Sequence, residues 1–266
     1  MIPAGDYMRD ALAVVLLLLP LGMAWDMDHQ AVGLSQLIVA TLLSILSLAL
    51  RYLKSASVLP DAMTPGRVQA VRLLMNTPYA IAVVVTLVLG YVGDARGGGP
   101  GSGGGVGVGM AIGLAGVLLA AQGRAAEQRG EHSDAALWRG ITMVIAVVAL
   151  ALGTLSAVIT MVEMSDDAAW NEFVVLLLGV VLFTVVPLIA VRGVTRGDSV
   201  WRDVVVVLGV AGLLAAVWAQ AADDTMGEAW SLRLDGPDVL FWPGLGAAAA
   251  AAGISAAAPA PHGAVR

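Results

Sequence analysis

Long runs of apolar residues, separated by short polar segments, set the pattern of this chain. Most runs approach or exceed the roughly 20 residues that a helix needs to cross a hydrocarbon core. They are continuously apolar instead of alternating, so they predict helices and exclude the strands of a membrane barrel. We expect eight spans, at about residues 8–25, 34–53, 70–92, 105–122, 138–161, 171–191, 202–220 and 238–258.

The predicted fold is therefore all-α, a polytopic helical membrane protein with residues 1–266 forming one integral membrane domain and no soluble domain. The last run is mostly alanine and glycine, so seven spans plus one buried or interfacial helix is the alternative. The first run is expected to be a retained helix, because its leader sets Arg9 against Asp6 and Asp10 and is a poor signal-peptide start. Residues 93–104 predict a flexible Gly-rich external loop, and residues 259–266 a short tail.

Composition agrees with this picture and narrows the chemistry. The chain is 59% hydrophobic and only 13% charged, whereas a soluble domain carries about 25% charged residues. It contains no cysteine, which excludes disulfides, thiolate metal sites and cysteine nucleophiles. We expect no cofactor and no nucleic-acid partner; the expected partners are the lipid bilayer and other membrane subunits or further copies of the chain.

The basic residues define a direction across the membrane. With a cytoplasmic N-terminus, twelve of the fourteen fall on the cytoplasmic side and two outside, as the positive-inside rule requires. The C-terminus is then also cytoplasmic if the last run spans. The Arg, Ala, Gly and Val bias indicates a bacterial genome, so the expected location is a bacterial inner membrane. Trp25 is predicted to mark the outer end of the first helix, as interfacial indoles do.

No predicted span has a charged residue or histidine near its middle. Such residues are costly in a membrane and are kept for proton or ion coupling. Their absence argues against a proton-driven carrier. It does not exclude a cation site built from backbone carbonyls at broken helices.

Polar residues accompany a proline in the third run, Asn76-Thr77-Pro78-Tyr79. Proline removes a helical hydrogen bond and bends the helix, so these side chains either stabilise a kink or line a polar transport site. Thr184, near Pro187 of the sixth run, is the other candidate for that site.

Glycines recur at four-residue spacing in the fourth run, which places them on one helix face. We interpret them as a helix-packing surface, within the bundle or against a partner. The set is Gly105, Gly109, Gly113 and, one turn on, Gly116.

Acidic residues of the predicted outer loops offer a weaker candidate, a divalent-cation site with carboxylate and imidazole ligands. Their spacing matches no metal motif, and acidic outer loops follow from the topology alone, so no metal site and no catalytic residue are predicted. The group is Asp26, Asp28, His29, Asp223 and Asp224.

The stretch Arg9-Asp10-Ala11-Leu12, continuing through Leu19 to Trp25-Asp26, resembles the first helix of a family of uncharacterised actinobacterial polytopic membrane proteins. That helix starts with Arg-Asp and ends at an aromatic–polar step near Pro-Trp. Here the proline is Pro20 and not the residue before Trp25. The resemblance covers about twenty residues and implies no activity.

Three functions remain open. The leading hypothesis is a non-catalytic subunit or scaffold of a membrane complex, so we lean against an enzyme. The alternative is a small-solute permease or channel-like transporter with a site near the third and sixth runs. The third is a membrane enzyme acting on lipid-linked substrates at the outer face through Asp26, Asp28 or Asp223.

Overall fold

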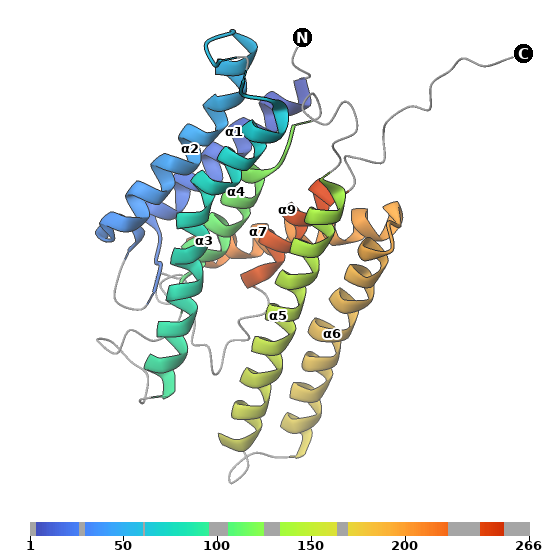
Figure 1. Cartoon of the computed structure of the whole chain (residues 1–266). Helices are drawn as coiled ribbons and strands as arrows, with labels where there is room; N and C mark the ends of the chain where they lie inside the picture. Colours follow the sequence, from blue (N-terminus) through green and yellow to red (C-terminus); the bar gives the residue numbers. More distant parts are fainter. Residues whose placement is uncertain are drawn as a thin grey trace, which may run out of the picture.

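The computed structural model describes residues 4–26, 30–60, 62–95, 106–124, 134–163, 170–222 and 240–252. These residues form a helical bundle (Figure 1) in which the only extended pairing is an isolated bridge between Ala24 and Gln30. The all-α fold class is confirmed. The helices are α1 (Ala4–Leu18), α2 (Ser35–Ser55), α3 (Pro65–Ala95), α4 (Val108–Ala121), α5 (Ala135–Glu163), α6 (Trp170–Thr195), α7 (Ser199–Ala222) and α9 (Trp242–Ala252).

Four segments of this bundle are long and apolar enough to cross a membrane: Ser35–Ser55, Gly66–Gly90, Ala135–Leu155 and Ser199–Trp218. Three helices are shorter as described. At 1.5 Å per residue, the 15 residues of α1 reach about 22 Å, the 14 residues of α4 about 21 Å and the 11 residues of α9 about 17 Å. These lengths are below the ~30 Å of a hydrocarbon core.

α4 lies at the centre of the bundle, in contact with α1, α2, α3, α7 and α9. Its glycines allow this close packing. A Cβ on Gly109 would lie 2.8 Å from the Ala24 carbonyl oxygen, and one on Gly116 would lie 2.8 Å from the Leu16 carbonyl carbon. A Cβ on Gly113 would overlap the Tyr79 hydroxyl. Gly105, the first of the predicted set, lies outside the described residues.

α9 is buried against α4, α5 and α7. Its crossing with α7 is a glycine-to-glycine contact, because a Cβ on Gly246 would lie only 2.6 Å from the Gly209 Cα. Alanines occupy most of the remaining α9 positions, and all but Ala250 are buried. The helix predicted at 238–258 is therefore described as Trp242–Ala252 and lies inside the bundle, while residues from 253 onward are outside the described part.

The first predicted span ends earlier than expected. α1 stops at Leu18, and a 3₁₀ turn containing Pro20 follows, Leu19–Gly22. The chain then runs past the start of α4, where Gly107 N donates to the Trp25 carbonyl at 2.8 Å and Gly109 N to the Ala24 carbonyl at 3.0 Å. These bonds satisfy amide groups that a helix N-terminus leaves without partners.

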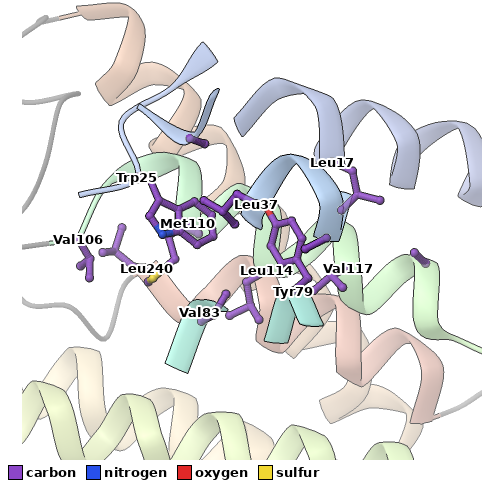
Figure 2. Close-up of a cluster of buried hydrophobic side chains, with 14 of the residues drawn as sticks. Leu17, Trp25, Leu37, Tyr79, Val83, Val106, Met110, Leu114, Val117 and Leu240 are labelled. Carbon is purple, nitrogen blue, oxygen red and sulfur yellow. The ribbon is translucent and has the colours of Figure 1, made fainter. Parts of the chain in front are cut away.

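Trp25 is in the core and not at a lipid interface. It is 1% exposed, its Nε1 donates to Thr86 Oγ1 at 2.6 Å, and its ring meets Tyr79 edge-on at 5.8 Å. Figure 2 shows both rings among Val83, Met110 and other apolar side chains. The expectation of an interfacial Trp25 differs from the structure because Thr86 gives the indole N–H a partner inside the bundle, where the headgroup layer was expected to provide one.

Candidate functional site

Charged side chains are buried at one end of the bundle, where α1, α3 and α5 begin and α2 and α4 end (Figure 1). Here we call this group the ionic cluster. Its buried members are Asp6, Asp10, Arg51, Arg72 and Arg124, and the partly exposed Arg9 and Tyr52 complete it; these residues come from α1, α2, α3 and the segment just after α4.

One ion pair joins α1 to α2. Arg51 Nη1 donates to Asp6 Oδ2 at 2.5 Å, and the two side chains are 6% and 4% exposed. Asp6 and Asp10 are four residues apart and share one face of α1. That spacing lets one helix turn present two carboxylates to its neighbours.

Asp10 joins α1 to the ends of α2 and α4. It accepts a hydrogen bond from Tyr52 Oη at 2.6 Å and forms an ion pair with Arg124 Nη2. Burial lowers the pKa of Arg124 to about 10, and the nearby Asp10 carboxylate opposes this shift. Arg124 is therefore still a cation at neutral pH.

Arginines also satisfy the last carbonyls of α4. Arg124 Nη1 donates to the Leu119 and Gln122 carbonyls, both at 3.0 Å, and Arg72 Nη1 donates to the Gln122 carbonyl at 3.1 Å. Arg9 Nη1 donates to the Gly123 carbonyl at 3.3 Å. Cations favour this negative end of a helix, so the cluster fixes the end of the short central helix.

Asp134 extends this polar end of the bundle to α5, which it directly precedes. Its Oδ2 accepts hydrogen bonds from Gln69 Nε2 at 2.8 Å and from Trp138 Nε1 at 2.9 Å. Trp138 is fully buried. A carboxylate at a helix N-terminus is favourable, and here it also links α3 to α5.

A second polar feature runs from the cluster into the bundle between α2 and α3; we call it the α2–α3 seam. It contains Thr41, Ser44 and Ser47 of α2 and Asn76 of α3, each at most 3% exposed. Asn76 Nδ2 donates to Ser47 Oγ at 2.9 Å and to the Arg72 carbonyl at 2.8 Å. Ser47 Oγ donates to the Ser44 carbonyl at 2.6 Å.

The candidates for a transport site lie in different surroundings. Asn76 and Tyr79 are buried, whereas Thr77 is exposed and its hydroxyl donates to the Leu73 carbonyl of its own helix at 3.0 Å. α3 continues through Pro78. Thr184 belongs to α6, but its side chain is outside the described part. The structure thus joins Asn76 to Ser47 and separates it from Thr77.

The outer acidic group is described only at Asp26, which is partly exposed. Asp28, His29, Asp223 and Asp224 lie outside the described residues. Within the part of the chain that the structure describes, no three His, Cys, Asp or Glu residues form a group able to hold a metal ion.

Sequence reasoning did not single out the ionic cluster. It took the arginines as markers of the cytoplasmic side and Asp6 and Asp10 as features of a poor signal peptide. One signal was present in the sequence. Asp6 and Asp10 are four residues apart, at a helix end where basic residues are frequent, and two such carboxylates need cationic partners if they are buried.

Comparison with known proteins places this architecture in one family. A family model described as a domain of unknown function, DUF7937, matches residues 6–266. The chain belongs to this family. No curated protein and no solved structure matches the chain. The matched range runs from Asp6 through α9 and contains every residue of the ionic cluster.

Proposed function

We propose that this protein is a non-catalytic subunit or scaffold of a membrane complex, embedded in a bacterial inner membrane. One observation carries the proposal: the buried charges bind one another and backbone carbonyls. Asp6 forms an ion pair with Arg51, and Asp10 forms an ion pair with Arg124 and accepts a hydrogen bond from Tyr52. Groups held in this way fix the relative positions of helices.

In this proposal the eight described helices are inserted in the membrane, with the ionic cluster at the cytoplasmic side and both termini cytoplasmic. The four long apolar segments support insertion. The short helices α4 and α9 are expected to be surrounded by longer ones, which is consistent with their burial. This proposal includes a relationship to the actinobacterial polytopic membrane proteins whose first helix the chain resembles.

Orientation is tested by single-cysteine labelling, because the chain has no cysteine of its own. Ser57→Cys lies in the turn after α2, close to the cluster, and Gln30→Cys lies at the opposite end of α2. A membrane-impermeant maleimide applied to intact cells should label Gln30→Cys and spare Ser57→Cys. The reverse labelling would refute the proposed orientation.

The scaffold role is tested by site-specific cross-linking from the exposed face of α7. Val207 is 66% exposed, whereas Val205, on the same helix, is fully buried. A photo-crosslinking residue at 207 should give one discrete adduct with a protein partner or a second copy, and the same residue at 205 should not. A purified monomer that cross-links only to lipid from position 207 and from other exposed positions would overturn the proposal.

A small-solute permease is the second candidate, and the α2–α3 seam is the observation in its favour. In vesicles, uptake of small neutral solutes should then exceed that of protein-free vesicles and should fall in Asn76→Leu. Equal uptake by both proteins and by empty vesicles would remove this candidate.

A further inference from the structure

Two polar atoms of the α2–α3 seam have no hydrogen-bond partner in the described bundle. They are the Ser44 hydroxyl and Asn76 Oδ1, and both are buried from solvent. Ser44 is 0% exposed and Asn76 3%. Buried polar groups are nearly always paired, and an unpaired one costs free energy. These two therefore require an explanation.

The orientation of the Asn76 amide is fixed by its neighbours. Its nitrogen donates to Ser47 Oγ and to the Arg72 carbonyl. Turning the amide over would place Oδ1 against the Arg72 carbonyl, bringing two acceptors together, which the hydrogen-bond inventory of an amide forbids. The atom left over is thus an acceptor, and its missing partner must be a donor.

The two atoms belong to one connected group. Ser47 Oγ accepts from Asn76 and donates to the carbonyl of Ser44, so Ser44 and Asn76 have a common neighbour. Ser44 and Ser47 lie three residues apart and so share a face of α2. Asn76 is on the facing helix, and α2 and α3 are packed against each other.

We propose that the α2–α3 seam binds a water molecule between Ser44 and Asn76. A water can donate to Asn76 Oδ1 and exchange a second hydrogen bond with the Ser44 hydroxyl, which gives it the two partners that a buried water needs. A metal cation fits less well, because the seam has no carboxylate and hard cations require six or more oxygen ligands.

The seam continues toward the ionic cluster on one side and meets the apolar core on the other. Arg51 follows Ser47 by four residues, and Arg72 precedes Asn76 by four, so polar side chains continue along both helices to the end of the bundle. In the opposite direction Leu37 and Val83 are buried in the apolar core. Water is therefore expected to enter the seam from the cluster end.

The test uses the sign of a single substitution, Ser44→Ala, in reversible unfolding of the full chain in mild detergent. A hydroxyl that binds water contributes to stability, so its removal should raise the unfolding equilibrium constant about fivefold. An unhydrated, unpaired hydroxyl would give the opposite result, no change or a lower constant, because its removal relieves a desolvation cost. That result would overturn the proposal.

A second substitution separates the water from general packing effects. In an Asn76→Leu background the effect of Ser44→Ala should disappear, because the water has lost its other partner; an undiminished effect would contradict the bridge. Ser55→Ala is the matched control, since the Ser55 hydroxyl is exposed and donates only to the Tyr52 carbonyl of its own helix.

If either variant fails to fold, an experimental density map of the unmodified protein decides. A peak between Ser44 Oγ and Asn76 Oδ1 supports the site, and an ordered seam without such a peak refutes it.

Discussion

The ion pair between Asp6 and Arg51 allows a quantitative test of the ionic cluster. Asp6→Asn removes one charge with little change in shape. Arg51 remains 5% exposed, and its Nη2 already has no hydrogen-bond partner. Removing one member of such a buried pair costs about 3–5 kcal/mol, because the other charge stays desolvated. Both side chains are almost fully buried, so solvent screening reduces this cost only slightly.

The measurement is reversible unfolding in mixed detergent micelles, followed by tryptophan fluorescence from the seven tryptophans. At about 1.4 kcal/mol per tenfold change, the unfolding constant of Asp6→Asn should rise by roughly two to four powers of ten. The double variant Asp6→Leu/Arg51→Met should recover most of that loss, since replacing both charges by apolar groups is often neutral.

The matched control is the exposed pair Arg202–Asp203, whose side chains are 30% and 67% exposed. Asp203→Asn should cost at most about 1 kcal/mol, and added salt should diminish that effect much more than the effect of Asp6→Asn. If Asp6→Asn costs no more than Asp203→Asn, the ionic cluster does not hold α1 to α2, and the argument for a structural role of these charges fails.

Two further predictions concern the glycine contacts. Gly246→Ala should destabilise the protein by about 1–3 kcal/mol, because the new Cβ meets the α7 backbone at Gly209. The control Gly140→Ala in α5 has nothing within 4 Å of its new Cβ and should stabilise the protein by about 0.5–1 kcal/mol. Equal effects of the two substitutions in unfolding experiments would contradict the α7–α9 crossing. Gly113→Ala should destabilise the protein because the new Cβ meets the Tyr79 side chain. In a Tyr79→Leu background this cost should fall by a coupling free energy of about 0.5–3 kcal/mol. Strict additivity in the double-mutant cycle would show that the two residues do not touch.

Hydrophobic patterning predicted the helices well, because the apolar runs of this chain are long and their polar separators are short. Every predicted run contains a described helix. What patterning left open was which helices lie inside the others. α4 is apolar and glycine-rich, a composition compatible with lipid contact and with burial alike, and only the packing of α1, α3 and α9 around it decides between them.

Candidate sites were harder to predict because they depend on pairing between distant residues. Asp6 and Arg51 are 45 positions apart, and Gln122 donates to the Ala247 carbonyl across 125 positions. Nothing in the local sequence specifies such partners. Asn76 was singled out as a candidate from its polar character beside Pro78, but its contact with Ser47 depends on how α2 and α3 pack against each other. The partners of Asn76 and Asp6 are properties of the tertiary structure.

The burial of α9 has a consequence for biosynthesis. This helix is translated after α4, α5 and α7, the helices that enclose it. In the proposed membrane arrangement, the space between these helices must be occupied by lipid or remain closed until α9 emerges from the ribosome. Because α9 spans only about 17 Å and consists mainly of alanine and glycine, it gains little from entering lipid alone. Its entry into the bundle is therefore expected to be a late step that completes the interior from its C-terminal side.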